Sequence, residues 1–258
     1  MRGREARARV LIAHAYYRQW GGEDTVFENE CALLEQAGYE VIPLWFSNRA
    51  YPARSAIRGQ LLGDGNAYRA ALSAIDRHHP ELVHIHNTFP FVGSAVADAA
   101  RSRGVPSVAT LHNYRLSCLN AQLFRAGEVC TRCVGQSFKT AGIVRGCYRQ
   151  SRPASLLLAA AGYRNRRRYS GPLAADYGIV LSAFQKDIMA REGIAPERLF
   201  VKRNFVNRPD VAERGAALAR PYILYVGRLT REKGVHVLVD AFRQARLGSV
   251  LDLVVLGD

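Results

Sequence analysis

Residues 221–234 read PYILYVGRLTREKG, and the segment VHVLVDAF follows them directly. The apolar run over residues 222–226, between a proline and a glycine, has the composition of a buried strand. Apolar residues then recur at helical spacing from about Lys233, which predicts a helix. Arg228 and Lys233 are therefore expected on the loop that leaves the carboxyl end of a strand, beside a helix N-terminus.

Two cations at such a place suggest an anion-binding site. Open α/β sheets bind ligands at the carboxyl ends of their strands, and the amide groups of a helix N-terminus favour negative charge. A diphosphate is the natural candidate for Arg228 and Lys233. The alternative is a solvated turn, because Arg and Lys are mostly exposed in proteins.

The arrangement Gly227-Arg228-Leu229, followed by Lys233-Gly234, resembles the start of the donor-binding domain of glycosyltransferase family 4. The members of that family are retaining enzymes of the GT-B fold, and their matching Arg and Lys contact the diphosphate of a nucleotide sugar. The resemblance implies the same role for Arg228 and Lys233, with a nucleotide diphosphate sugar as donor substrate and no required catalytic metal.

The rest of the chain alternates predicted strands with helical segments, which predicts an α/β fold with a Rossmann-like doubly wound parallel sheet. The resemblance divides the chain into an N-terminal acceptor-side domain (1–207), a linker (208–220) and an incomplete nucleotide-sugar-binding domain (221–258), which holds its first βαβ unit. The strands of the first domain are predicted at residues 9–14, 39–45, 81–86, 105–111, 176–182 and 199–204.

Composition supports a folded protein but leaves the partner open. The 258 residues are 48% hydrophobic and 22% charged, which is enough apolar material for a substantial core. The net charge of +14 suits nucleic acid, an anionic membrane face or phosphorylated substrates, although a compositional bias of the genome would give the same excess of Arg.

Targeting signals are not recognisable in the sequence. The longest apolar stretches, such as residues 156–162, are too short to span a bilayer, and the basic N-terminus precedes an apolar run that suits a strand better than a signal peptide. We therefore expect a cytoplasmic location and cysteines that are reduced thiols or metal ligands.

Gly21 and Gly22 follow the first predicted strand and precede a helix. Paired glycines let a ligand approach the backbone at a helix N-terminus, although a simple strand-to-helix turn also uses them. They resemble the Gly-Gly-x-Glu-like element of family 4, which implies contact with the donor phosphates. Here the acidic residues Glu23 and Asp24 follow the glycines directly, which departs from the family pattern.

His86 and His112 fall at the ends of neighbouring predicted strands, and each is followed by Asn. A single His at a strand end is often structural, but two at adjacent ends favour a site. The resemblance implies that His112, which matches a cleft His of the family, contacts the donor sugar or acceptor as the catalytic residue. Residues implied to support the cleft are His86, Asn113, Ser182 and Asn204.

The segment 113–150 interrupts the strand–helix alternation and contains Cys118, Cys130, Cys133 and Cys147. A Cys-x-x-Cys with one further Cys on each side can supply four thiolates to a structural zinc ion, which would hold a loop that has little core of its own. An iron–sulfur cluster, four reduced cysteines and a redox pair at 130 and 133 remain alternatives. Similar Cys-bearing loops occur in a branch of family 4.

Residues 129–175 contain no acidic side chain but many Arg. A helix at about 153–169 would have an apolar body and a basic end, which suits contact with an anionic membrane that carries a lipid-linked acceptor. A buried helix whose last-turn Arg side chains complement its dipole is the alternative. Nucleic acid is not expected, because aromatic residues are not interleaved with these Arg residues as a stacking platform requires.

The sequence thus predicts transfer of a sugar from a nucleotide diphosphate sugar to a glycan or lipid-linked acceptor, in the synthesis of cell-surface polysaccharide. In family 4 a Glu-x7-Glu element further along the donor domain binds the sugar and ribose, and residues 221–258 do not include one. We therefore expect little or no activity from these 258 residues alone. The alternatives are a non-catalytic Arg-rich module that binds a membrane surface or nucleic acid, and a partner subunit of a complete transferase.

Overall fold

The computed structural model describes residues 8–49, 59, 63–206 and 220–257. The chain divides into two compact units, Met1–Leu123 with Cys130–Asn207, and Phe124–Val129 with Arg208–Asp258. Most of the predicted linker lies outside the described residues.

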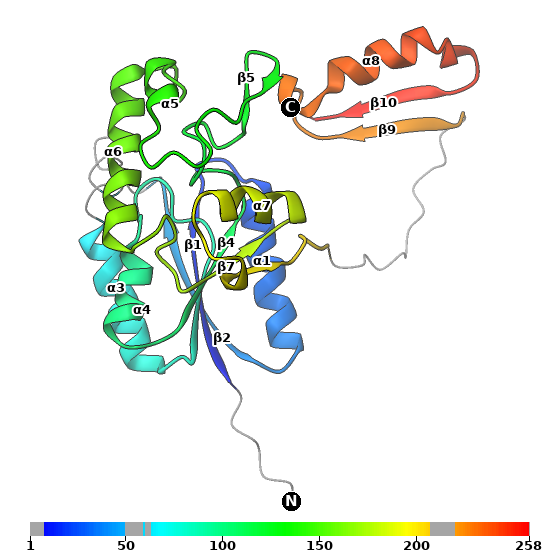
Figure 1. The fold of residues 1–258 in the computed structure, drawn as a ribbon. Coiled ribbons are helices and arrows are strands. Elements are labelled where there is room, and N and C mark those ends of the chain that lie inside the picture. Colours follow the sequence, from blue (N-terminus) through cyan, green and yellow to red (C-terminus); the bar gives the residue numbers. More distant parts are fainter. Residues whose placement is uncertain (1–7, 50–58, 60–62, 207–219, 258) are drawn as a thin grey trace, which may run out of the picture. The chain divides into compact units, whose positions relative to one another are not determined.

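The first unit is built on a six-stranded parallel sheet with the order β2-β1-β3-β4-β7-β8 (Figure 1). This sheet, with helices between its strands, confirms the predicted α/β, Rossmann-like fold class. The strands are β1 (Arg9–Tyr16), β2 (Glu40–Ser47), β3 (Leu82–Ile85), β4 (Ser107–Leu111), β7 (Tyr177–Val180) and β8 (Leu199–Val201).

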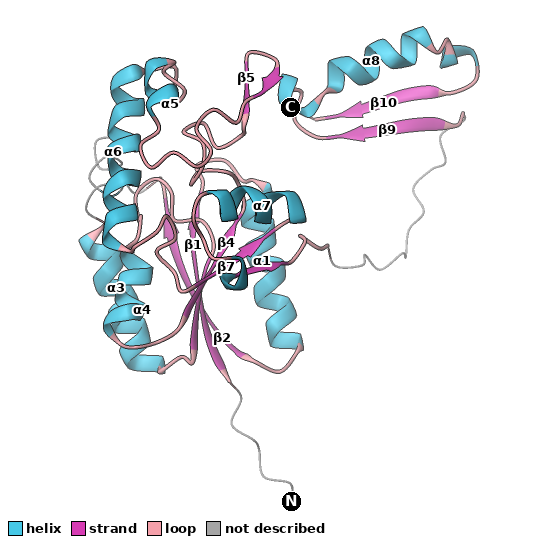
Figure 2. Ribbon diagram, viewed as in Figure 1, coloured by secondary structure: helices cyan, strands magenta, loops and turns pink. Residues whose placement is uncertain are grey.

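Helices cover both faces of the sheet, as Figure 2 shows for α1 on one side and α3 with α4 on the other. Alternate residues of β1 point to opposite faces: Val10 and Ile12 pack with Phe27 of α1, whereas Leu11 and Ala13 belong to the core beneath α3 and α4. Burial on both faces explains why β1 reads as a continuous apolar run. Helices α1 (Gly22–Gln36), α3 (Gly65–His78), α4 (Ala95–Ser102) and α7 (Ala183–Arg191) lie between these strands in the sequence.

The long segment between β4 and β7 contains more regular structure than the sequence predicts. It includes the short antiparallel pair β5 (Phe124–Arg125) and β6 (Glu128–Val129), the helix α5 (Thr140–Val144) and the longer α6 (Arg152–Arg168). Helix α6 matches the predicted helix at about 153–169. Its start is capped by Ser151, whose hydroxyl accepts from the amide of Ala154.

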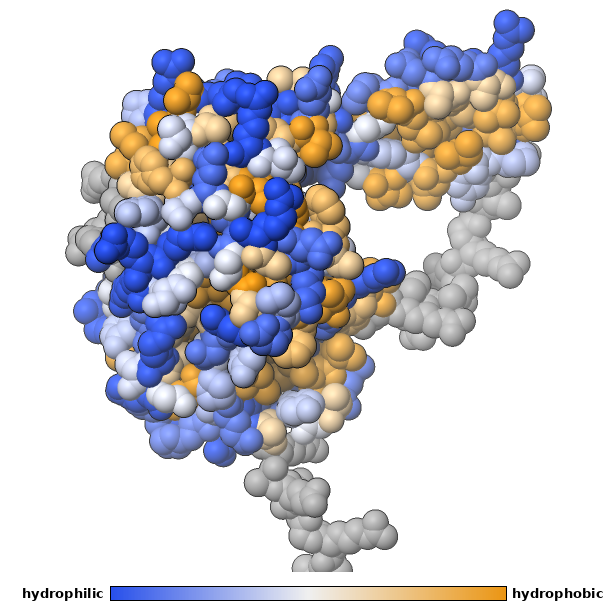
Figure 3. Space-filling model, viewed as in Figure 1, coloured by the Kyte–Doolittle hydropathy of each residue, from blue (hydrophilic) through white to orange (hydrophobic). Residues whose placement is uncertain are grey.

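The second unit contains the predicted strand–helix–strand segment. Strands β9 (Tyr222–Val226) and β10 (Asp252–Leu256) are parallel and are joined through a 3-10 turn (Arg231–Lys233) and α8 (Val235–Gln244). The prediction that β9 is buried is wrong for the described residues, since Leu224 is 49% and Val226 71% exposed. One helix covers a two-stranded sheet on one face only, and Figure 3 shows apolar side chains at the surface of this unit.

None of the described helices is both long enough and apolar enough to cross a bilayer.

Candidate active site

The carboxyl ends of β3 and β4 bring two of the predicted histidines together. His86 follows β3 and His112 follows β4, and these strands are neighbours in the sheet. The Nδ1 atom of His86 lies 3.0 Å from Nε2 of His112, and the rings stack with centroids 5.2 Å apart. The two side chains therefore form a hydrogen-bonded pair at the edge of the sheet where parallel α/β proteins bind ligands.

Burial keeps these imidazoles neutral at physiological pH. Burial, followed by the charges of His14, His84 and Lys202, lowers the pKa of His112 to about 4. Burial also lowers the pKa of His84 to about 3 and that of His86 well below 6.5. A neutral imidazole has one N–H donor and one lone pair, so these rings act here through hydrogen bonds rather than through charge.

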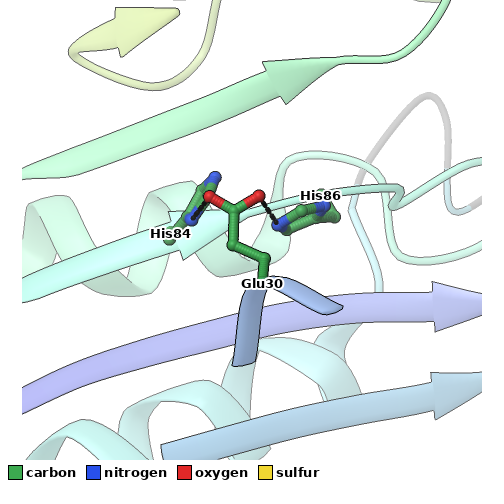
Figure 4. A group of neighbouring side chains, drawn as sticks. All are labelled: Glu30, His84 and His86. Carbon is green, nitrogen blue, oxygen red and sulfur yellow. Dashed lines mark ion pairs between the residues drawn. The ribbon is translucent and has the colours of Figure 1, made fainter. Parts of the chain in front are cut away.

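Glu30 of α1 reaches these rings from the helix that covers the sheet. Its carboxylate faces both His84 and His86, with O–N separations of 3.7 Å and 3.6 Å (Figure 4). The ammonium of Lys202, which follows β8, donates to the same carboxylate at 2.8 Å. Within the described ranges, Glu30, His84 and His86 form a set whose ligand atoms lie within 4.8 Å of one another, and such a set can hold a metal ion.

Sequence analysis missed Glu30 and Lys202 as parts of this network. A signal for Glu30 exists: it follows Val26 and Phe27 at helical spacing, so it falls on the apolar, inward face of α1. A Glu at an inward position requires a partner, because an unpaired buried charge is costly. Nothing in the sequence identifies that partner as a lysine 172 positions away.

The loop that carries the predicted Gly21 and Gly22 is anchored by Asp24. The buried Asp24 carboxylate accepts from the amide of Gly21 at 2.7 Å, and its other oxygen lies 2.7 Å from Nε2 of His14. His14 belongs to β1 and stacks on Phe27 of α1, with ring centroids 4.8 Å apart. The glycine loop is thus tied to the first strand through one carboxylate.

The fold itself does not require a glycine at position 22. A Cβ atom built on Gly22 would meet nothing within 4 Å, whereas one on Gly21 would contact Asp24 at an ordinary 3.7 Å. Open space beside Gly22 leaves room for a ligand at the N-terminus of α1. The geometry is therefore compatible with a ligand approaching this loop.

Asn113, which follows His112, is held by a carboxylate from the glycine loop. Its amide donates to Glu23 at 3.1 Å, and the hydroxyl of Tyr17 donates to the same carboxylate at 3.1 Å. Burial raises the pKa of Glu23, opposed by these two hydrogen bonds. The structure thereby connects the predicted Asn113 to the predicted glycine loop, through a Glu23–Tyr17 pair that sequence analysis did not assign.

The other two predicted cleft residues have different surroundings. Ser182 caps α7, with its hydroxyl accepting from the amide of Gln185 at 3.1 Å. The side chain of Gln185 donates to the carbonyl of Leu111 at 2.7 Å, which ties α7 to the end of β4. Asn204 is exposed in the segment after β8. Ser182 therefore has a structural role that its placement alone explains.

The four predicted cysteine ligands lie in the segment before α6. None of the chain's cysteines forms a disulfide, and burial raises the pKa of the Cys133 thiol, with smaller effects from neighbours that include Cys118 and Cys147. No three of the described thiols come within the ligand spacing that Glu30, His84 and His86 satisfy. Zinc coordination by Cys118, Cys130, Cys133 and Cys147 stays a prediction.

A buried ion pair anchors the same segment. Lys139 donates to Glu192 at 2.7 Å and to the carbonyl of Cys133 at 3.0 Å. The amide of Gly135 donates to the other oxygen of Glu192 at 2.8 Å, and Arg166 of α6 also contacts this carboxylate. Because Glu192 is fully buried, these donors compensate its charge and fix the segment to the end of α7.

In the second unit, the predicted cations occupy the turn between β9 and α8. Gly227 and Gly234 border this turn with φ angles of 153° and 71°, and Gly234 caps α8 in the left-handed region that favours glycine. The Arg228 side chain is 62% exposed and lies 3.9 Å from Glu232. Arg228 and Lys233 are thus solvent-accessible cations beside a helix N-terminus, as predicted.

Comparison with known proteins assigns the family. The model of the glycosyl transferase 4-like domain matches residues 1–204, which includes the whole six-stranded sheet with its histidine pair. This chain belongs to the glycosyl transferase 4-like domain family. No curated protein sequence matches it.

Solved structures resemble this glycosyl transferase 4-like chain at low sequence identity. The apo form of the lipopolysaccharide outer core galactosyltransferase WaaB aligns with a TM-score of 0.50 and 11% identity, over 97% of this chain and 68% of that one. The glycotransferase of kitacinnamycin aligns with a TM-score of 0.48 and 12% identity, over 97% and 66% of the two chains. Anabaena Alr3699/HepE in complex with UDP and glucose gives 0.45 and 16%, over 95% and 60%. The first of these supports the GT-B fold, and the chain spans only part of each of these proteins.

Proposed function

We propose that this chain serves in the transfer of a sugar from a nucleotide diphosphate sugar to a glycan or lipid-linked acceptor, in the synthesis of a cell-surface polysaccharide, with little or no turnover expected from these 258 residues alone. The observation that carries the proposal is the family match over residues 1–204, combined with the hydrogen-bonded His86–His112 pair at the strand ends. The WaaB likeness, from an enzyme named for lipopolysaccharide, favours a cell-surface product over a soluble one.

The roles of the site residues follow from their chemistry. His112 contacts the donor sugar or acceptor as a neutral hydrogen-bonding group, supported by His86 and Asn113. Gly21 and Gly22 leave room for the donor phosphates. Arg228 and Lys233 bind the diphosphate and stabilise the negative charge that develops on it as it departs, which lowers the barrier to transfer.

No catalytic metal is needed for this mechanism, because the two cations of the second unit neutralise the leaving group. Ser182 and Asn204 complete the proposed cleft residues. A structural zinc ion on Cys118, Cys130, Cys133 and Cys147 is a separate proposal. Cobalt titration tests it: thiolate coordination gives charge-transfer absorption that Cys130→Ser abolishes, and a spectrum without such absorption contradicts it.

Diphosphate recognition is the step that tests the proposal most simply. Calorimetric titration compares a nucleoside diphosphate with the corresponding monophosphate, for uridine, guanosine and adenosine. We expect at least one nucleoside diphosphate to bind more tightly than its monophosphate. The paired substitution Arg228→Ala with Lys233→Ala should lower the affinity for this diphosphate roughly tenfold or more, since hydrogen bonds to charged groups contribute about 1.5–3 kcal/mol each.

The matched control is Arg243→Ala, because Arg243 is an exposed cation on the last turn of α8. This variant removes the same charge from the same unit as either single substitution, Arg228→Ala or Lys233→Ala, but leaves the predicted phosphate turn intact. If it weakens binding of the diphosphate as much as either single substitution does, then binding reflects net charge alone and the proposed site is wrong.

A further inference from the structure

Glu30 faces His86, which in turn contacts His112, so Glu30 can influence how His112 binds its ligand. We propose that Glu30 is a positioning residue which, through His86, fixes the tautomer of His112 so that its Nδ1 is a hydrogen-bond acceptor for a hydroxyl of the sugar or acceptor. The identity of that hydroxyl rests on the proposed function, but the tautomer is a property of this chain alone.

The first step is the charge of Glu30. Its side chain is 8% exposed, and the Lys202 ammonium donates to Oε2 at 2.8 Å. This contact is an ion pair between the Lys202 ammonium and the Glu30 carboxylate. Glu30 therefore presents an anion to the buried interior, and an ionised carboxylate only accepts hydrogen bonds.

The second step concerns the two ring nitrogens that face this anion. Oε1 lies 3.7 Å from Nδ1 of His84 and Oε2 lies 3.6 Å from Nε2 of His86 (Figure 4). In a buried environment, an N–H directed at a carboxylate is electrostatically favoured and a lone pair directed at it is disfavoured. No other protein group in the described structure hydrogen-bonds the Nε2 atom of His86, so Glu30 decides its protonation.

The position of the proton on His86 in turn determines the position of the proton on His112. A neutral His86 that carries its proton on Nε2 has a lone pair on Nδ1. That lone pair lies 3.0 Å from Nε2 of His112, so His112 must donate from Nε2. The single proton of a neutral His112 is then accounted for, and its Nδ1 holds a lone pair.

His84 is consistent with the same rule. With a proton on Nδ1 toward Glu30, its Nε2 accepts the hydroxyl proton of Thr110 across 2.8 Å. A hydroxyl serves as donor or acceptor equally well, so Thr110 imposes no conflict. The reverse assignment would direct the lone pairs of both imidazoles at one buried carboxylate.

A metal ion bound by Glu30, His84 and His86 is the competing explanation. It would place lone pairs, rather than N–H groups, toward the centre of the group and would invert every tautomer above. Lys202 argues against it, because its ammonium already contacts the carboxylate oxygen nearer to His86. A divalent ion at bonding distance from that oxygen would repel this ammonium.

Nitrogen-15 spectra of the histidine rings test the proposal in the intact chain near neutral pH. Protonated and unprotonated ring nitrogens have well-separated shifts, so the tautomer is read directly. The proposal requires His112 with Nε2 protonated and Nδ1 unprotonated; the opposite tautomer overturns it. Spectra that change when a chelator is added would show a bound metal and would also overturn it.

The role of Glu30 is tested separately with Glu30→Gln, whose amide can either donate to or accept from His86. We expect the ring shifts of His112 to move toward the mean of the two tautomers, while Glu35→Gln, an exposed carboxylate on the same helix, leaves them unchanged. Unchanged shifts in Glu30→Gln would remove Glu30 from the account. None of these spectra requires a sugar donor, so their outcome is independent of whether the chain proves to be a glycosyltransferase.

Discussion

At the scale of single residues, one buried carboxylate holds both hydrogen-bond partners of Asp24. One oxygen pairs with His14 and the other accepts from the amide of Gly21. Asp24→Asn replaces one acceptor with an NH2 donor, which leaves a buried group without its partner and costs about 1–3 kcal/mol. We expect urea denaturation to show this loss, with Glu35→Gln as the unaffected control. Equal stability of the two variants would contradict this role of Asp24.

The lowered histidine pKa values predict how stability depends on pH. His112 titrates at about 4 in the folded chain against an ordinary value of 6.5, so between these values the unfolded chain binds a proton that the folded chain does not. Unfolding is therefore favoured as pH falls from about 6.5 toward 4, while at higher pH the contribution is complete. Urea denaturation across this window should show falling stability, with a shallower slope in His112→Gln. A slope that the substitution leaves unchanged would show that His112 is not buried in this way.

At the scale of elements, the buried Glu192 group is the anchor of the segment between β4 and β7. Lys139→Met removes one of the two cations that contact the fully buried Glu192 carboxylate. Removal of one partner of a buried ion pair costs roughly 3–5 kcal/mol. We expect a lower urea midpoint and faster proteolysis between residues 120 and 150. Arg103→Ala, which removes an exposed ion pair with Asp76, serves as the control and should change little. Similar behaviour of the two variants would mean that another feature holds the segment.

Most elements could be predicted from the sequence, because each strand of the first sheet is a short apolar run that ends at polar or glycine residues. The histidine pair could also be predicted, since His86 and His112 each follow such a run. The Glu30–Lys202 contact could not, because its partners come from α1 and the end of β8, far apart in the chain. The exposure of β9 was also mispredicted, because an apolar run specifies a strand but not what covers it.

At the scale of the whole molecule, the charge of +14 gives a prediction about membranes. Part of the basic end of α6 is engaged internally, since Arg166 contacts Glu192 and Arg168 lies 3.2 Å from Asp98. We propose that the Arg and Lys side chains without such internal partners make a peripheral contact with the inner face of the cytoplasmic membrane. Co-sedimentation should show salt-sensitive binding to vesicles with anionic lipid and none to neutral vesicles. Equal binding to both would contradict an electrostatic contact, and tight, steeply salt-dependent duplex binding would favour the nucleic-acid alternative.

The central proposal is that His112 contacts the sugar of a nucleotide diphosphate sugar. The measurement that tests it most directly is titration of His112→Gln with a nucleotide diphosphate sugar and with the same nucleoside diphosphate. We predict that this substitution weakens binding of the nucleotide diphosphate sugar roughly 2- to 10-fold, because one hydrogen bond is lost, and leaves binding of the nucleoside diphosphate unchanged. Equal effects on the two ligands, or no effect on either, would contradict the claim.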